Sequence, residues 1–144
     1  MKNIIMIANF KFPKNWDAYF YLAKTLYERY NFFAVSEGMN KQLALTNNVK
    51  LISKSEALKI NIDIAILLSK SEGFPNVLME YTSIWKSIVC HDNAGDALNY
   101  FIPGINSISI EDLYLDKENL DIKISNLITK CPLKSNFKKI SEIQ

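Results

Sequence analysis

The order of segments along this 144-residue chain predicts an α/β protein built on a parallel sheet. Short apolar runs alternate with amphipathic stretches, and the runs lack the alternation of a strand that faces water on one side. Strands that alternate with helices favour a parallel sheet with helices on both faces. Right-handed crossovers then leave few topologies, and a doubly wound, Rossmann-like sheet of about six strands is the simplest of them.

The first half of the chain supplies three of the expected strands. Residues 4–8 form a continuous apolar run, which is typical of a strand covered on both faces. Residues 16–30 carry apolar side chains at spacings of three and four, which predicts one long helix. The members of that stripe are Trp16, Tyr19, Phe20, Ala23, Leu26, Tyr27 and Tyr30. The next expected elements are a strand over 32–36, a short helix over 41–45, a strand over 49–52 and one helical turn over 55–59.

The second half begins with the most apolar stretch, residues 62–68, which we interpret as a central strand. A loop leads from it to Pro75, a residue that suits the first turn of a helix. The remaining expected elements are a strand over 87–91, a short helix over 94–100, a last strand over 105–110 and a helix over 117–130. Residues 1–131 are thus expected to form one domain, and residues 132–144 a polar, basic tail.

Composition excludes several classes of function. Lys and Arg number 17 against 15 Asp and Glu, and a net charge of +2 is too small to indicate a nucleic acid or an anionic membrane as partner. Cys90, Cys131 and the single His91 make no Cys/His framework, so we expect no metal and reduced thiols. No apolar run approaches the roughly 18 residues of a spanning helix. We therefore expect a cytoplasmic protein.

Ligands of an open parallel sheet bind at the loops beyond the carboxyl ends of its strands. Neither a G-x-G-x-x-G dinucleotide fingerprint nor a P-loop follows any expected strand, which counts against a nicotinamide dehydrogenase and a P-loop nucleotidase. The loops that remain as candidates span residues 9–15, 36–41, 53–55, 69–76 and 91–95.

The loop after the central strand stands out among these candidates. Gly73 allows a ligand to approach the backbone closely, and Pro75 starts a helix whose free N–H groups and dipole suit a diphosphate. Glu80 lies about one and a half turns into that helix, near enough to accept two sugar hydroxyls, and Glu72 lies at the loop mouth. The same residues also fit an ordinary helix start with acidic side chains near the positive end of its dipole.

The run S-E-G-F-P-N-V-L-M-E over residues 71–80 resembles the E-x7-E segment of the family-four retaining glycosyltransferases. Those enzymes have the GT-B architecture, in which two Rossmann-like domains face each other across a cleft, and the motif lies in the C-terminal, donor-binding domain. Residues 8–14, A-N-F-K-F-P-K, are similar to the family's opening basic loop, and residues 103–107 resemble its late D-G-x-N-G turn.

The resemblance implies a role for each matching residue. Lys11, which replaces the usual arginine, and Lys14 are expected to neutralise the diphosphate of a nucleoside-diphosphate sugar. Glu80 is expected to accept hydrogen bonds from the ribose hydroxyls. Glu72 is expected to contact the reacting face of the donor sugar and is the candidate catalytic residue. Backbone N–H groups are expected to hold phosphate and sugar oxygens along the run Gly73, Phe74, Pro75, Asn76, Val77 and Leu78, although proline carries none.

The implied activity is transfer of a sugar from a nucleoside diphosphate to a saccharide or lipid-linked acceptor with retention, in polysaccharide or glycolipid biosynthesis. No metal cofactor is expected, because no D-x-D motif is present. The acceptor-binding half must come from a domain or subunit outside this chain, so the chain is expected to be inactive by itself. The alternative is a non-catalytic Rossmann-like module that binds a nucleotide or a protein. Donor base, sugar and acceptor stay open.

Overall fold

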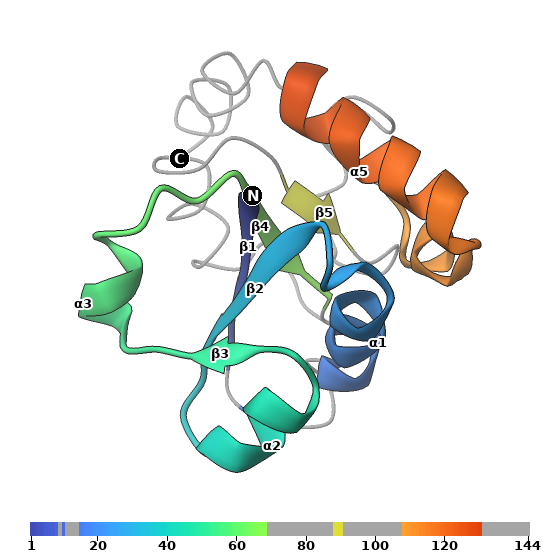
Figure 1. Ribbon diagram of the computed structural model, residues 1–144. Coiled ribbons are helices and arrows are strands. Elements are labelled where there is room, and N and C mark those ends of the chain that lie inside the picture. Colours follow the sequence, from blue (N-terminus) through green and yellow to red (C-terminus); the bar gives the residue numbers. More distant parts are fainter. Residues whose placement is uncertain (9, 11–14, 69–87, 91–107, 131–144) are drawn as a thin grey trace, which may run out of the picture.

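The computed structural model describes residues 1–8, 10, 15–68, 88–90 and 108–130, and it contains a five-stranded sheet in the order β3-β2-β1-β4-β5 (Figure 1). Every neighbouring pair of these strands is parallel. The α/β class and the parallel sheet predicted from the sequence are therefore confirmed. The strands are β1 (Lys2–Ile7), β2 (Tyr30–Val35), β3 (Lys50–Leu51), β4 (Ile64–Leu67) and β5 (Ile88–Cys90).

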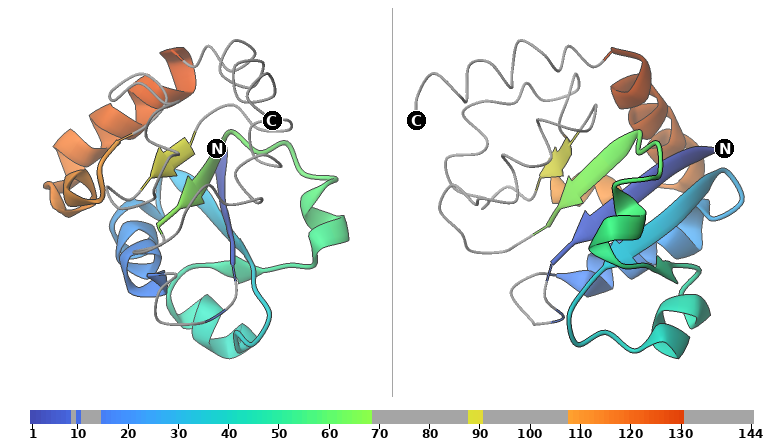
Figure 2. Two further views of the ribbon diagram at one scale, coloured as in Figure 1. Left: turned by 180° about the vertical axis from the view of Figure 1, so that it is seen from behind. Right: turned by 90° about the vertical axis from the view of Figure 1, so that its left-hand side faces the viewer.

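The strand order shows that the sheet is doubly wound. From β1 the chain moves outward through β2 to β3, and it then returns to place β4 on the other side of β1. Because crossovers are right-handed, reversing the direction of travel moves the connecting helix to the opposite face. Figures 1 and 2 show α3 (Lys54–Ala57) on one side of the sheet and α1 (Trp16–Leu26) with α5 (Lys117–Lys130) on the other.

The register of the strands builds the main core on the face that α1 and α5 cover. Ile4 is in register with both Phe32 and Ile64, and Met6 is in register with Ala34 and Ile66. All of these side chains are buried, and each large one contributes about 1.5–3 kcal/mol by leaving water. The helices contribute the buried side chains Ala18, Tyr19, Leu22, Ala23 and Leu26 from α1 and Leu120, Ile124 and Leu127 from α5.

Tyr19 ties α1 to the two central strands by polar contacts as well as by packing. Its side chain is fully buried, and its hydroxyl oxygen lies 2.6 Å from the carbonyl oxygen of Phe33 and 3.3 Å from that of Ile4. A buried hydroxyl needs such acceptors, because an unpaired one costs about 1–3 kcal/mol. The opposite face of the sheet is also sealed, with Ile5 and Ala65 in register and fully buried.

Two predicted elements differ from the structure. The helix predicted over 16–30 ends at Leu26, because Tyr30 pairs with Lys2 as the first residue of β2, and Tyr27 is left 48% exposed in the turn. The strand predicted over 105–110 does not extend through its described part: residues 108 and 109 are not in a strand, and the 3-10 helix η3 (Ile110–Tyr114) starts at 110. A capping box between Ser109 and Asp112 favours that helix start.

The other described elements lie close to their predicted positions. The short helix expected over 41–45 is α2 (Lys41–Thr46), and the helix expected over 117–130 is α5 with the same bounds. Asn40 caps α2 by accepting hydrogen bonds from the backbone N–H groups of Gln42 and Leu43. The helices expected after Pro75 and over 94–100 lie outside the described residues, as does the basic tail of residues 132–144.

Candidate functional site

The two ends of the sheet define two regions, which we name the carboxyl edge and the amino edge after the strand ends that form them. At the carboxyl edge, the topological switch point lies between β1 and β4, because β2, which follows β1, and β5, which follows β4, lie on opposite sides of this pair. Ligands of open α/β sheets bind at such a switch point. The candidate site is therefore the carboxyl edge beside Ile7 and Leu67, the last residues of these strands.

The two segments that the sequence singled out follow, in the sequence, the two strands of this switch point. The basic loop follows β1, and the E-x7-E segment follows β4, which pairs directly with β1. The order of the strands thus makes neighbours of the two strands after which these segments follow in the sequence. The predicted site residues themselves lie outside the described residues, and they are Lys11, Lys14, Glu72, Gly73, Phe74, Pro75, Asn76, Val77, Leu78 and Glu80.

Backbone hydrogen bonds extend the pairing of β1 and β2 past the ends of both strands. The N–H of Ala8 donates to the carbonyl oxygen of Val35, and the N–H of Phe10 donates to that of Glu37, each at 3.1 Å. Phe10 therefore lies at a defined position on the carboxyl edge, immediately before Lys11 in the chain.

The ring of Phe10 belongs to an aromatic cluster that we define as Phe10, Trp16 and Phe20. The centroid of the Phe10 ring lies 6.4 Å from that of Trp16 and 6.5 Å from that of Phe20, and the last two rings are 6.1 Å apart. Trp16 and Phe20 are buried, whereas Phe10 is 38% exposed. Trp16 and Phe20, two members of the stripe predicted over residues 16–30, thus pack in the core and also support a residue of the carboxyl edge.

Asn15 connects the basic loop to α1 in a left-handed conformation, with φ of 60° and ψ of 47°. Asn is one of the few residues besides Gly that adopt this conformation readily. Its side chain makes no capping hydrogen bond to the first turn of α1.

The loop between β2 and α2 forms a further part of the carboxyl edge. Gly38 has a φ of +90°, which strains residues with a Cβ atom, and a Cβ placed there would lie 3.8 Å from the Cβ of Phe10. Two residues earlier, the Oγ atom of Ser36 is shielded from solvent and has no hydrogen-bond partner in the described part of the chain. Sequence reasoning named this loop and the loop over residues 9–15 as candidates but did not single out Ser36 or Phe10, because their surroundings depend on the pairing of β2 with β1.

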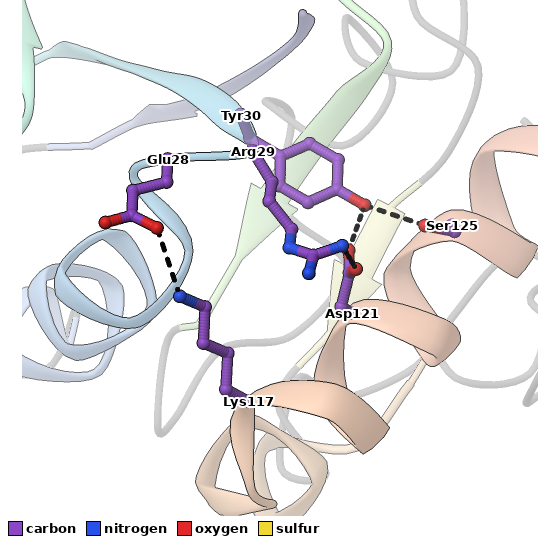
Figure 3. Close-up of polar contacts among 6 residues, drawn as sticks. All are labelled: Glu28, Arg29, Tyr30, Lys117, Asp121 and Ser125. Atoms are coloured by element: carbon purple, nitrogen blue, oxygen red, sulfur yellow. Dashed lines mark hydrogen bonds and ion pairs between the residues drawn. The ribbon is translucent and has the colours of Figure 1, made fainter.

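The amino edge holds a polar group of residues that we name the amino-edge cluster (Figure 3). Asp121 accepts hydrogen bonds from Arg29 Nη1 at 2.6 Å and from the Tyr30 hydroxyl at 2.9 Å. Because the single Tyr30 hydroxyl proton goes to Asp121, Ser125 Oγ donates to Tyr30 at 2.9 Å. Lys117 Nζ lies 3.4 Å from Glu28 Oε2. These contacts join the turn after α1 to α5.

The electrostatics of this cluster follow from its contacts. Burial raises the pKa of Tyr30 to about 12, and the Asp121 carboxylate adds to the rise. The hydrogen bond from Lys117 lowers the pKa of Glu28. Since these side chains satisfy one another, the amino-edge cluster has the character of a structural contact and not of a ligand site.

A pocket of about 260 Å³ lies at the outer edge of β2, away from the switch point. The described part of its lining comprises Tyr27, Tyr30, Asn31, Phe32, Phe33, Leu45, Asn48, Val49 and Lys50. Among these residues most are apolar or aromatic, and Lys50 is the one charged side chain, so they offer no arrangement suited to a diphosphate.

Two further observations concern only the described residues. Within these ranges, no three His, Cys, Asp or Glu side chains lie close enough together to hold a metal ion. Among the helices that the structure describes, none combines the length and the apolar character that crossing a membrane requires. His91 and Cys131 lie outside these ranges.

Comparison with known proteins identifies the fold. The sequence matches no protein-family model and no curated protein. Among solved structures, the chain is similar to the C-terminal domain of a glycosyl transferase group 1 family protein (LpcC) from Francisella tularensis. The TM-score is 0.70 at 15% sequence identity, over 98% of this chain and 85% of that one.

Two other structures extend this likeness. The catalytic domain of cholesterol-α-glucosyltransferase from Helicobacter pylori gives a TM-score of 0.66 at 14% identity, over 96% of this chain and 95% of that one. Anabaena HepE in complex with UDP-glucose gives 0.57 at 14% identity, over 98% of this chain and 48% of that one. The chain thus spans about half the length of HepE.

The fold is therefore that of one half of the GT-B architecture. More narrowly, it is the fold found in the C-terminal domains of group 1 glycosyltransferases, in agreement with the resemblance noted in the sequence.

Proposed function

We propose that this chain is the donor-binding domain of a retaining glycosyltransferase that takes its sugar from a nucleoside-diphosphate sugar. The observation that carries the proposal is that β1 and β4, the strands that the two singled-out segments follow in the sequence, are paired neighbours on either side of the topological switch point. The likeness to HepE, whose structure holds UDP-glucose, supports the same ligand class.

The chemistry proposed for the site is stabilisation of a diphosphate leaving group. Lys11 and Lys14 supply positive charge, and the N–H groups at the start of the helix expected after Pro75 supply hydrogen bonds to the phosphates. Glu80 accepts the ribose hydroxyls, and Glu72 contacts the donor sugar at its reacting face. These groups stabilise the departing diphosphate without a metal ion.

The acceptor belongs to a part of the enzyme outside this chain. A GT-B enzyme reacts in the cleft between two domains, and this chain matches only one of them. We propose that a separate domain or subunit binds a saccharide or lipid-linked acceptor, and that this chain alone binds donor without turnover. We propose that the enzyme works in the cytoplasm, with at most peripheral contact with the inner membrane. Its role there is in polysaccharide or glycolipid assembly.

Calorimetric titration with UDP and with GDP tests the proposal. We expect heat of binding and a raised melting temperature with at least one of them. Lys14→Ala is expected to weaken binding about tenfold, since a charge-assisted hydrogen bond contributes about 1.5–3 kcal/mol. Glu80→Ala should weaken binding to a similar degree. Lys117→Ala is the matched control, because it removes the same charge from the amino edge.

Two results would count against this function. Absence of both heat and thermal stabilisation with UDP and GDP contradicts donor binding. Binding that Lys14→Ala and Glu80→Ala both leave unchanged would instead favour the non-catalytic module, in which the E-x7-E segment is architectural only.

A further inference from the structure

Phe10 is held at the carboxyl edge by its backbone and by its ring at the same time. Its N–H donates to the carbonyl oxygen of Glu37 at 3.1 Å, and its ring contacts Trp16 and Phe20. Those two partners are buried at 4% and 8% exposure, so they are fixed parts of the core. Phe10 therefore has little freedom to move relative to the sheet.

The exposure of Phe10 indicates that filling the core is not its main role. Phe10 keeps 38% of its surface accessible, whereas the core side chain Tyr19 is fully buried. An exposed large apolar side chain gains only part of the usual burial energy. A contact of this kind at a loop start has a second consequence: it fixes the backbone from which the next residues extend.

The residues that extend from Phe10 are those assigned to the diphosphate. Lys11 is bonded directly to it, so their Cα atoms are about 3.8 Å apart, and Lys14 is three residues further on. Gly38 turns beside Phe10, so closely that a Cβ added to this glycine would lie 3.8 Å from the Phe10 Cβ. The loop after β2 therefore supports the same point of the carboxyl edge.

We infer that Phe10 is a positioning residue for the donor site: through the aromatic cluster it fixes the point of the carboxyl edge at which the chain continues to Lys11 and Lys14. This inference rests on the proposed function. A ligand binds more tightly to charges that are already oriented, because ordering a side chain and its loop on binding costs conformational entropy. Removing the ring is thus expected to weaken nucleotide binding although Phe10 itself carries no group that recognises phosphate.

A double-mutant cycle on the whole chain tests this inference, with UDP and GDP as the probes. We expect Phe10→Ala to weaken binding about 5–10-fold, Phe10→Tyr to bind like the wild type, and Phe10→Ala to add little in a Lys11→Ala/Lys14→Ala background. The non-additivity is the decisive readout, because a general loss of structure would weaken binding in both backgrounds. Tyr114→Ala, which removes an exposed aromatic side chain elsewhere, is the matched control.

The outcomes separate this inference from the function on which it rests. If the wild type binds neither nucleotide, the proposed function and the inference both fail. The inference alone fails in two cases, both of which require that the wild type binds and that Lys14→Ala weakens binding. In the first, Phe10→Ala binds as tightly as the wild type. In the second, the fold-loss of affinity from Phe10→Ala is as large in the lysine variants as in the wild type. The cycle is also run with Phe10→Leu, which keeps an apolar side chain, in case the alanine variant loses cooperative unfolding.

Discussion

The amino edge and the carboxyl edge of the sheet use polar groups in different ways. At the amino edge, the charged side chains of Arg29 and Asp121 bind each other at 2.6 Å, and Tyr30 shares the same carboxylate. At the carboxyl edge, Phe10 is held by a backbone hydrogen bond and by packed rings. Charges that neutralise one another stabilise the fold, whereas the contacts of Phe10 involve no charged side chain.

The difference also reflects which parts of the chain each edge joins. The hydrogen bonds of Asp121 and Ser125 connect residues 91 to 95 positions apart, and they attach α5 to the start of β2. The contacts of the carboxyl edge link neighbouring loops around β1 and β2. We therefore expect mutations at the amino edge to change stability and mutations at the carboxyl edge to change binding.

The largest effect is expected from Asp121→Ala. This change removes the acceptor of both Arg29 and Tyr30, and we expect the free energy of unfolding to fall by about 1–2 kcal/mol, because Arg29 is largely exposed and the Tyr30 contact is partly buried. Urea denaturation measures the loss. Nucleotide affinity should stay at the wild-type value, and a change in affinity with unchanged stability would contradict the division between the two edges.

Tyr30→Phe is expected to remove a pH dependence in alkaline solution. The pKa of Tyr30 is about 12 in the folded chain, against 10 for an ordinary tyrosine, so above pH 10 the unfolded chain loses this proton first. The contribution of Tyr30 to stability is thus complete below pH 10 and is lost as the pH rises toward 12. Urea denaturation from pH 8 to 11.5 should show the wild type falling toward the variant. Parallel dependences of stability on pH for the wild type and the variant would indicate that the pKa of Tyr30 is not raised in the folded chain.

Ser36→Ala is expected to raise the free energy of unfolding by up to about 1 kcal/mol. The Ser36 Oγ atom is shielded from water without a partner in the described part of the chain, and an apolar methyl group at that position has no such penalty. The matched control is Ser53→Ala, which should lower the melting temperature, because Ser53 caps α3 by accepting the N–H of Glu56. A Ser36→Ala variant less stable than the wild type would show that the hydroxyl has an acceptor.

The smallest effect is expected from Lys117→Ala. Lys117 and Glu28 face each other at 3.4 Å, but both side chains are about half exposed, and water screens such pairs strongly. The melting temperature should stay within experimental error of the wild type. A clear loss would mean that the outer part of the amino-edge cluster stabilises α5 as much as Asp121 does.

The sequence predicted the elements whose periodicity is undisturbed. In α5, Leu120, Ile124 and Leu127 keep a helical spacing, and its predicted bounds are those observed. The predicted first helix ran too far because Tyr27 and Tyr30 keep the helical phase, although one lies in the turn and the other in β2. Only pairing with β1, a contact between distant residues, determines where β2 begins.

For the candidate site, the sequence indicated which loops to examine, and the strand order makes neighbours of the strands that precede two of them. The roles of Phe10 and Ser36 could not be predicted, because each depends on tertiary contacts: the ring packing on Trp16 and Phe20, and the shielding of the hydroxyl at the end of β2. The pattern of residues along the chain does not reveal either contact.

The most direct test of the central claim is a nuclear magnetic resonance titration of the isotope-labelled chain with UDP and with GDP. If donor binds at the switch point, the amide signals of Ala8, Phe10 and residues 36–40 shift on titration, while those of Arg29 and Asp121 stay in place. Shifts confined to the amino edge, or an unchanged spectrum with both nucleotides, would contradict the account.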